Sequence, residues 1–546
     1  MKKKNEESDQ FGLVSVYLVL LFLIAIAIFL FSSSSNSTTS HQSFLRCLLD
    51  DHHIPPSMIT TRDSNSFSSL LNFSIQNPRI YGNTYPTLIV SPTSESHVQH
   101  AITCAKKHRI HMRVRSGGHD YEGLSYTSTL GPFILLDLFN LRSISIDVTS
   151  NTAWVQSGAT LGELYHAISE KAGPNVAFPA GVCPTVGIGG HLSGGGLGTL
   201  VRAFGLAADQ VVDARLVNAN GEIQNRKSMG EGLFWAIRGG GCCFGIILSF
   251  KVTLVQVPPN VTVFSASRTL NQGATKLVTK WQNVAHELDR RLFIRVVLVP
   301  DEDEEGSKTV KATFNSLFLG SKAELLPLMG VSFPELGLRE EDCTEMSWIK
   351  SVLYFSGYLS GGKNESALTE RGVVDPFFAP FKAKSDFVKE PVSEQGWDNI
   401  WKWFSEENEF LIVILDPFGG RMDEISESET PFPHRNGSLY NLQYMVKWDV
   451  AEGSELTGKH LNWTKRFYEF MAPYVSKNPR AAYYNYRDLD LGRNEEGANS
   501  YLTANVWGRR YFKDNFRRLA EVKSEVDPDN FFRNEQSVPP LFHSGK

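Results

Sequence analysis

The chain of 546 residues carries a formal net charge of −5 at pH 7, and 42% of its residues are hydrophobic and 21% charged. These values are typical of a globular protein long enough for two or three domains. A slightly acidic chain without a basic stripe argues against a nucleic-acid partner.

The N-terminus has the pattern of a targeting segment. Lysines at positions 2–4 precede an uncharged run over residues 11–31. A signal peptide needs an apolar core of roughly 7–15 residues and a membrane span needs roughly 20. We therefore expect residues 1–31 to be a signal peptide or a retained signal-anchor, with a buried core helix as the weaker alternative, and residues 32–43 to be a spacer.

Two further features agree with entry into the secretory pathway. The chain has six cysteines and no C-x-x-C pair, which favours disulfides in an oxidising compartment over a zinc site. N-x-S/T glycosylation acceptors occur at Asn36, Asn72, Asn260, Asn364, Asn436 and Asn462. We expect the protein in the apoplast, the vacuole or the endomembrane lumen, with membrane contact only through an N-terminal anchor.

Residues 44–80 are expected to form a mixture of helix and loop. After them, hydrophobic periodicity predicts alternating strands and helices. A strand at 88–90 precedes a helix with Ser94 as N-cap, and a second strand covers 112–115. A further helix opens near Thr160. The stretch 211–225 predicts a hairpin that turns at Asn220-Gly221, and 244–259 predicts another strand pair that ends at Pro258-Pro259.

The second half of the chain has a different pattern of predicted helices and strands. Longer helical stretches alternate with strands at 291–300 and 409–420, which indicates a second α+β domain. After an aromatic stretch near 483, residues 506–532 predict one charged, aromatic helix.

Three glycine clusters lie within one region, at 115–120, 187–198 and 238–245. Backbone amides in such loops can point at phosphate oxygens, because glycine tolerates positive φ and close approach. Three clusters together favour a large anionic cofactor. The spacing does not match a dinucleotide fingerprint, and the P-loop-like stretch 357–364 has Asn364 where a magnesium-binding Ser or Thr is needed.

Five motifs together resemble the plant berberine bridge enzyme-like flavoproteins, whose relatives include the cannabinoid synthases. The motifs are "RSGGHDYEGLSY", "GVCPTVGIGGH", "RKSMGEGLFWAIRGGG", "YYNYRDLDLG" and "DPDNFFRNEQSVPPL". The resemblance runs from about Ser43 to Leu541. It implies an α+β fold of the vanillyl-alcohol oxidase type, with a PCMH-type FAD domain in two subdomains (44–258), a substrate domain on an antiparallel sheet (259–478) and a C-terminal segment returning to the FAD domain (479–546).

The resemblance also implies an FAD that is attached twice. His119 matches the histidine bonded to the flavin 8α-methyl group, and Cys183 matches the cysteine bonded to C6. Two such bonds would make the flavin a stronger oxidant. His191 is expected to have a structural role instead. The other residues that the resemblance places at the cofactor are Arg115, Ser116, Gly117, Gly118, Asp120, Val186, Gly187, Gly189, Gly190, Gly194 and Ile246.

The same resemblance implies a disulfide between Cys47 and Cys104, and it leaves Cys242, Cys243 and Cys343 without a role. The Cys242-Cys243 pair is a departure, since relatives have a small or polar residue followed by Ser or Asn in a loop about one residue longer. Gly232 also stands where an aspartate is usual. Both differences concern the cofactor loops and not the fold.

On the substrate side, the resemblance makes Tyr486 the catalytic base. A free tyrosine has a pKa near ~10, so a cationic neighbour such as Arg487 is expected to lower it. Gln443 and Arg295 match positions that line the substrate pocket. Arg295 is a candidate for binding a phenolate or carboxylate, and also for supplying the positive charge that is missing because Asn441 stands where some relatives carry lysine. Leu197 is expected to make one wall of the substrate pocket apolar.

Val186 matches the position over the oxygen-reactive flavin face, where valine favours oxidases. We therefore expect a monomeric, metal-free oxidase that acts on a small apolar phenolic, prenylated or alkaloid substrate, closes a ring or forms a double bond, and reduces O2 to H2O2. Two alternatives remain open at this point: an oligosaccharide or carbohydrate oxidase, and a non-redox cyclase that keeps FAD as a scaffold.

Overall fold

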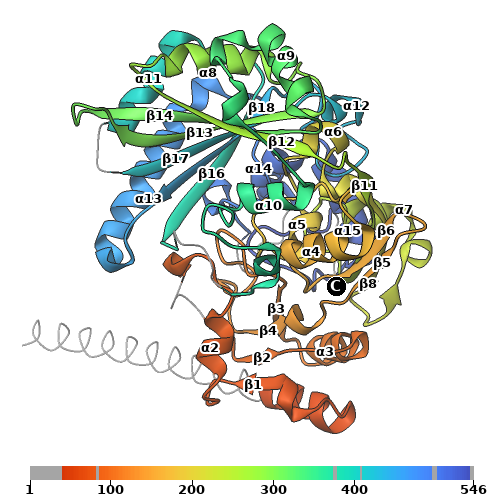
Figure 1. Cartoon of the computed structure of the whole chain (residues 1–546). Coiled ribbons are helices and arrows are strands. Elements are labelled where there is room, and N and C mark those ends of the chain that lie inside the picture. The colour runs from red at the N-terminus through yellow and green to blue at the C-terminus, as the bar shows by residue number, and fades with distance from the viewer. Residues whose placement is uncertain (1–39, 81–84, 373–377, 406–408, 495–500, 542–546) are drawn as a thin grey trace, which may run out of the picture.

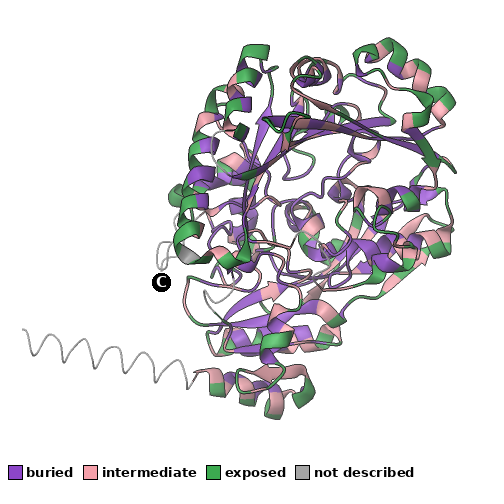
Figure 2. Cartoon of the chain, turned by 60° about the vertical axis from the view of Figure 1, so that its left-hand side comes forward, coloured by how far each residue is buried: buried purple, intermediate pink, exposed green. Residues whose placement is uncertain are grey.

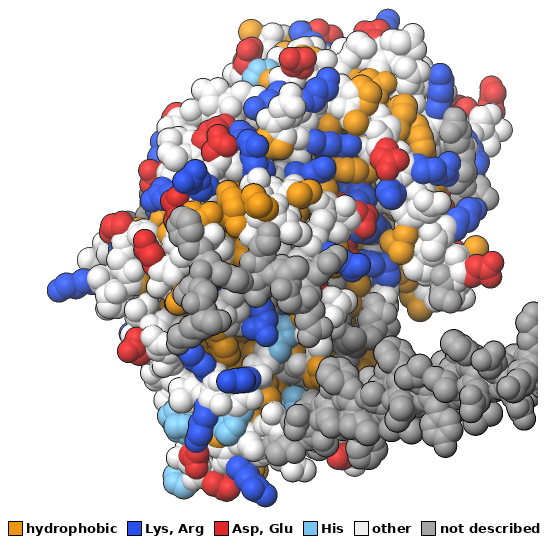
Figure 3. Space-filling model, turned by 180° about the vertical axis from the view of Figure 1, so that it is seen from behind, with side chains coloured by type: hydrophobic (Ala, Val, Ile, Leu, Met, Phe, Trp, Pro, Cys, Tyr) orange, Lys and Arg blue, Asp and Glu red, His pale blue; other side chains and the backbone are white. Residues whose placement is uncertain are grey.

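The computed structural model describes residues 40–80, 85–372, 378–405, 409–494 and 501–541. The predicted targeting segment and acceptor Asn36 lie outside these residues. Within them, no helix combines the length and the apolar character needed to cross a bilayer. On the face seen in Figure 3, acidic and basic side chains are interspersed.

The first sheet has four strands in the order β1-β2-β4-β3, and the last three are parallel. Its strands are β1 (Ile59–Thr61), β2 (Leu88–Val90), β4 (Phe133–Asp137) and β3 (His111–Arg115). Helix α3 (Glu95–Lys107) joins β2 to β3, and the Ser94 side chain caps it by accepting from the His97 amide. The strand–helix–strand prediction for this region is thus borne out.

The second sheet is antiparallel, with the order β5-β6-β10-β8-β9. Its strands are β5 (Ile144–Asp147), β6 (Thr152–Gln156), β10 (Ile246–Thr253), β8 (Val211–Val217) and β9 (Ile223–Gln224). Helices α4 (Leu161–Ala172), α5 (Ile188–Ser193) and α7 (Arg226–Ala236) belong to the same region. Thr160 and Glu163 form a capping box at the start of α4, as the predicted helix start requires.

The predicted strand pair over 244–259 is wrong in its pairing. Strand β10 pairs with β6 and β8, whereas the short β11 (Val255–Gln256) pairs with β7 (Val176–Ala177) in a separate two-stranded sheet. The run of β-branched residues specified two strands. Only the tertiary structure decided that each pairs with a partner distant in sequence.

The third sheet has seven antiparallel strands in the order β15-β12-β14-β13-β17-β18-β16. Its strands are β15 (Cys343–Met346), β12 (Val261–Thr269), β14 (Lys308–Phe318), β13 (Leu292–Glu302), β17 (Phe410–Pro417), β18 (Tyr440–Lys447) and β16 (Phe381–Val388). Its associated helices are α8 (Ala274–Val284), α9 (Lys322–Ser332), α10 (Trp348–Phe355), α11 (Glu394–Ser405) and α13 (Gly453–Phe470). Helices α8 and α11 lie on the face turned away from the rest of the molecule (Figure 1). Figure 2 shows that the strands are largely buried, while the outer helices expose one side.

The C-terminal segment returns to the first half of the chain. The single helix predicted over 506–532 is instead two helices, α14 (Tyr501–Phe512) and α15 (Asn515–Val526), because Lys513 has a positive φ of 46° that interrupts the helix. Helix α15 packs on α7, and the Lys523 ammonium donates to the Cys243 carbonyl oxygen at 2.6 Å. The segment therefore closes over the glycine cluster at 238–245. The remaining short helices are α2 (Phe67–Asn72), α6 (Val201–Phe204) and α12 (Arg421–Glu424).

The predicted disulfide is confirmed. Cys47 and Cys104 are bonded, and they join the N-terminal turn Cys47–Asp51 to helix α3. Cys242, Cys243 and Cys343 are reduced. Both Cys242 and Cys243 contribute to the lining of the cavity described below, and the Cys243 thiol also lies 4.0 Å from the Val538 carbonyl oxygen.

Candidate functional site

A cavity of about 550 Å³ lies between the glycine loops, the inner face of the seven-stranded sheet and the C-terminal segment. Side chains from all three parts line it, among them His119, Cys183 and Tyr486. Its volume is in the range of small-molecule and cofactor sites. The cavity is therefore a site that is shared between the two halves of the chain.

The glycines of the first two clusters allow their loops to touch backbone to backbone. A Cβ atom on Gly117 would lie 2.2 Å from the Gly187 amide nitrogen, and one on Gly187 would lie 2.3 Å from the Gly117 amide nitrogen. Gly118 also has a φ of +73°, and a Cβ there would meet the Ser74 carbonyl oxygen at 2.3 Å. A side chain at Gly117 or Gly187 would separate the two loops, and one at Gly118 would displace the backbone at Ser74.

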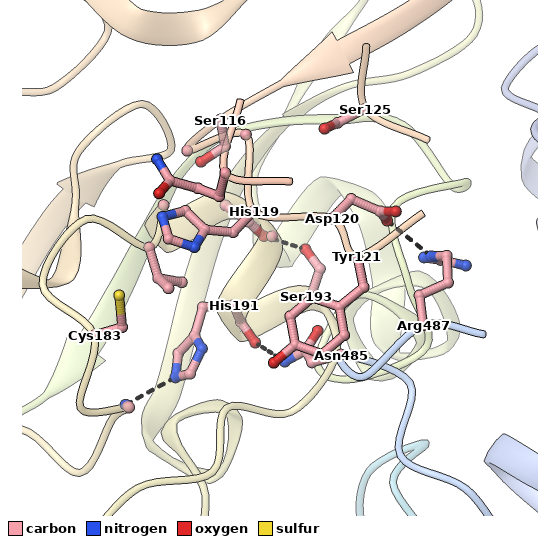
Figure 4. Close-up of a pocket in the computed structure, with 18 of the residues that line it drawn as sticks. Ser116, His119, Asp120, Tyr121, Ser125, Cys183, His191, Ser193, Asn485 and Arg487 are labelled. Atoms are coloured by element: carbon pink, nitrogen blue, oxygen red, sulfur yellow. Dashed lines mark hydrogen bonds and ion pairs between the residues drawn. The ribbon is translucent and has the colours of Figure 1, made fainter. Parts of the chain in front are cut away.

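His119 and Cys183 are brought together at one threonine. The Thr185 hydroxyl lies 2.9 Å from His119 Nε2 and 3.6 Å from Cys183 Sγ. Figure 4 places the His119 ring and the Cys183 sulfur on one side of the cavity. Two side chains that can form covalent bonds therefore converge on one region, although 64 residues separate them in sequence (183 − 119).

His191 has a separate, structural role. Its Nε2 accepts a hydrogen bond from the Gly181 amide at 3.0 Å, so this nitrogen carries no proton. Burial, with a smaller contribution from His119, lowers the pKa of His191 to about 4. A neutral His191 holds the glycine-rich turn at 181 against helix α5.

An ion pair and three buried polar side-chain atoms also belong to residues that line the cavity. The Arg487 Nε donates to Asp120 at 2.8 Å (Figure 4). Among the described residues, no hydrogen-bond partner exists for Arg487 Nη1, Ser125 Oγ or Ser157 Oγ, although all three atoms are buried. Because buried polar groups are normally paired, these atoms fit a polar ligand in the cavity.

The sheet side of the cavity is built around two stacked tyrosines. The rings of Tyr121 and Tyr486 lie 5.7 Å apart at an interplanar angle of 2°. The Gln443 amide donates to the Tyr121 hydroxyl at 2.6 Å, and the Tyr483 ring packs edge-on against Tyr486. Tyr121 was missed by the sequence reasoning, although it directly follows His119-Asp120 in the motif that identified the loop.

The predicted activation of Tyr486 by Arg487 is not what the structure shows. Arg487 turns to Asp120, and Arg295 is held by a bidentate pair with Asp416 at 2.6 and 2.9 Å. Burial raises the pKa of Tyr486 well above its usual value, and Asp416 raises it further while Arg295 opposes this. Adjacency in sequence did not predict the partner, because successive side chains of this loop point in different directions.

Most of the predicted cofactor residues line the cavity, and two do not. Those that line it, besides His119 and Cys183, are Ser116, Gly117, Gly118, Asp120, Val186, Gly187, Gly189, Gly190 and Ile246. Arg115 instead turns inward, where its guanidinium pairs with Asp137 at 2.6 Å. A Cβ on Gly194 would lie 1.9 Å from Asn485 Oδ1, so Gly194 is needed for packing against the C-terminal segment.

The substrate end of the cavity is largely apolar. Arg295, Gln443 and Tyr486 line it as predicted, and so does Leu197. Its further walls come from Phe355, Phe381, Ile414 and Met445, which sequence reasoning did not single out. Asn441 is turned away and donates to the Asp386 carbonyl oxygen.

Comparisons with known families agree with this geometry. Residues 86–226 match the family described as "FAD binding domain", and residues 482–539 match the family described as "Berberine and berberine like". The first match spans the loops with His119 and Cys183, and the second begins at the tyrosine-rich stretch before Arg487.

Individual relatives cover nearly the whole chain. Berberine bridge enzyme-like 22 of Arabidopsis thaliana is 51% identical over 88% of this chain and 88% of its own length. Monolignol oxidoreductase AtBBE-like 13 of the same plant is 49% identical over 92% and 94%, and the tetrahydroberberine oxidase of Argemone mexicana is 48% identical over 93% of each. The crystal structure of Phl p 4, a grass pollen allergen with glucose dehydrogenase activity, superposes with a TM-score of 0.85 at 44% identity, over 91% of this chain and 100% of that one.

The residues present fit FAD. The glycine loops allow a ligand to approach the backbone closely. The hydroxyls of Ser125 and Ser157 and the Arg487 Nη1 atom are buried and could bind polar groups of a ligand. The cavity also extends past His119 and Cys183 to the tyrosine pair. A dinucleotide with a polar phosphate part and a planar ring system has matching requirements.

Proposed function

Because this chain belongs to the berberine bridge enzyme-like family of FAD-dependent oxidoreductases, we propose that it is an oxidase of an apolar phenolic, prenylated or alkaloid substrate. The observation that carries the proposal is the single cavity in which the His119–Cys183 pair, the tyrosine pair and apolar walls meet. Relatives named for monolignol and tetrahydroberberine oxidation support this substrate class.

His119 and Cys183 are the residues that would hold FAD covalently, since both side chains reach the Thr185 hydroxyl. FAD bound there would supply the hydride acceptor, with O2 as the proposed final acceptor that would be reduced to hydrogen peroxide. Val186, which lines the same cavity, leaves room for O2 where a larger side chain would not.

Tyr486 accepts the substrate hydroxyl proton in this proposal. Its ring lies against Tyr121 and Tyr483. Burial and Asp416 raise the pKa of Tyr486, and Arg295 is the cation that opposes this rise. Arg295 is held in place by Asp416, so it orients the proton acceptor and does not bind a free substrate anion. Gln443 fixes the Tyr121 hydroxyl next to the substrate.

Carbohydrate oxidation is the second candidate, and the likeness to a structure named for glucose dehydrogenase activity favours it. Leu197, Phe355 and Phe381 weigh against it, because a sugar needs polar walls where these side chains stand.

The deciding experiment mixes the yellow protein anaerobically with coniferyl alcohol, tetrahydroberberine or glucose in turn and follows flavin absorbance near 450 nm. We expect bleaching by one of the first two, followed by peroxide release when air is admitted. Bleaching by glucose alone would move the assignment to carbohydrates. Product formation without bleaching would replace the oxidase with a non-redox cyclase.

We also propose a monomer in the secretory lumen. Asn260, Asn364, Asn436 and Asn462 are exposed, as glycan acceptors need to be, and the Cys47–Cys104 disulfide suits an oxidising compartment. Plant expression followed by glycosidase treatment and size-exclusion chromatography tests this. An unchanged mass after treatment would contradict the lumenal location.

A further inference from the structure

Strand β16, at one edge of the seven-stranded sheet, carries three charged residues on one face. Lys382, Lys384 and Asp386 are only 4%, 1% and 0% exposed. Charged groups are rarely buried unless they are paired. The partners come from the loop after His119 and from the C-terminal segment, so this strand face is where the two halves of the chain meet the sheet.

The Lys382 ammonium contacts three carboxylates from these two segments. It donates to Glu122, to Asp488 Oδ1 at 2.8 Å, and lies 3.3 Å from Asp490. Glu122 directly follows Tyr121, and Asp488 lies two residues after Tyr486. One cation thus connects the neighbours of both stacked tyrosines.

Each of these carboxylates has a second cation. Arg79 pairs with Glu122 at 2.8 Å, and Lys384 pairs with Asp488 at 2.8 Å and with Asp490 at 2.6 Å. Loss of Lys382 would therefore leave no carboxylate without a partner. What it would remove is the link between Glu122 and Asp488.

A second link joins the same two segments, because Asp120 pairs with Arg487 at 2.8 Å. The segments that carry Tyr121 and Tyr486 are thus joined by two separate sets of ion pairs. Asp120 and Arg487 line the cavity, whereas Lys382 is buried and is not among the residues that line it.

We propose that Lys382 is a positioning residue for the reaction: by tying Glu122 to Asp488, its ammonium group holds Tyr121 and Tyr486 parallel at the substrate end of the cavity. The proposal rests on the proposed function of Tyr486. It does not require Lys382 to touch substrate or cofactor. A small displacement of a proton acceptor is enough to matter, because a misplacement of about 1 Å can cost about 100-fold in rate.

The test uses the flavin-loaded enzyme and three variants. Lys382→Met removes the link between Glu122 and Asp488, whereas Lys382→Arg conserves the positive charge. Lys384→Met is the matched control, because it removes a buried lysine of the same strand and leaves the ion pairs of Glu122 intact. We expect Lys382→Met to lower the limiting rate of anaerobic flavin reduction by about 10- to 100-fold while substrate affinity changes little. Lys382→Arg should restore most of the rate, and Lys384→Met should stay near wild type.

A second measurement needs no substrate. Hydrogen–deuterium exchange of the flavin-loaded protein should rise in peptides covering both 119–125 and 484–491 in Lys382→Met, and not in 119–125 in Lys384→Met. Equal effects of the two methionine variants, or unchanged exchange at 119–125 in Lys382→Met, would overturn the proposal. If none of the three test substrates reduces the wild-type flavin, the proposed function fails while the exchange data still decide whether the link exists.

Lys382→Met leaves the buried cluster with one excess negative charge. The double variant Lys382→Met/Glu122→Gln restores neutrality and still lacks the link, so it should retain the rate defect. Recovery of the wild-type rate in the double variant would show that net charge matters and positioning does not.

Discussion

The rings of Tyr121 and Tyr486 stack at an interplanar angle of 2°, although Tyr121 belongs to a glycine loop of the first half and Tyr486 to the C-terminal segment. The Gln443 amide donates to the Tyr121 hydroxyl, and Arg295, held in its pair with Asp416, acts electrostatically on Tyr486. Three separate parts of the chain therefore have to assemble before this end of the cavity exists.

Replacing Tyr486 by phenylalanine removes the proposed proton acceptor and keeps the ring. General base catalysis is worth roughly 100- to 10,000-fold, so flavin reduction should slow by about that factor. Because burial raises the pKa of Tyr486, the wild-type rate should increase with pH through the alkaline range, and the variant's rate should be nearly independent of pH. Stopped-flow reduction across pH measures both. An unchanged rate in the variant would exclude Tyr486 as the base.

The roles proposed for His119 and Cys183 in attaching the flavin can be tested by measuring the colour that stays on the polypeptide. His119→Ala and Cys183→Ala should each keep yellow flavin on the denatured polypeptide, because the other bond remains, whereas the double variant should lose it. His191→Gln should keep both bonds, since His191 contacts the Gly181 amide. Absorbance of acid-precipitated, washed protein is the measurement. Colour retained in the double variant would place the attachment elsewhere.

Val186→Leu should slow reoxidation several-fold and leave anaerobic reduction unchanged. The added methylene narrows the cavity at the position proposed to admit O2. Mixing the reduced enzyme with oxygenated buffer measures this step. Val186→Ala is the control and should reoxidise at least as fast as wild type; a leucine variant with the wild-type oxygen rate would contradict the role.

Buried neutral histidines should make the protein acid-sensitive. Burial, with help from Arg113, lowers the pKa of His111 to about 3 from a usual 6.5, and that of His191 to about 4. As the pH falls, these histidines bind protons in the unfolded chain before they do so in the folded protein, which favours unfolding. Their contribution to the free energy of unfolding is therefore complete above pH 6.5 and is lost as the pH falls towards 4 for His191 and 3 for His111. Over this pH range the unfolding temperature of His111→Gln should decrease less than that of the wild type. His53→Gln, a substitution at an exposed position, should not have this effect. Parallel pH curves for all three proteins would refute the assignment.

The Cys47–Cys104 disulfide closes a loop with a sequence separation of 57 residues. Restricting a loop of this length in the unfolded state is worth about 4 kcal/mol. The double variant Cys47→Ala/Cys104→Ala should unfold at a clearly lower denaturant concentration, with the flavin retained. Cys343→Ala, which removes a buried thiol outside the disulfide, is the control.

Much of the local structure could be predicted from the sequence, because it depends on neighbours along the chain. Ser94 and Thr160 precede helices and accept hydrogen bonds from amides of the first helical turn. The break at Lys513, in contrast, was not predicted, because the hydrophobic pattern continues through it. The resemblance of the motifs pointed to the glycine loops, to His119 and Cys183, and to the disulfide.

The sequence by itself determined which segments form most of the helices and strands and which glycines permit close backbone contact, and it named His119 and Cys183 as candidates for bonding a flavin. Only the tertiary structure decided that Arg487 pairs with Asp120, that Arg115 turns to Asp137, and that Lys382 joins the two tyrosine segments. The physical reason is that a buried charge is stable only beside an opposite charge. Which opposite charge is near depends on how distant segments pack, and that information is not local.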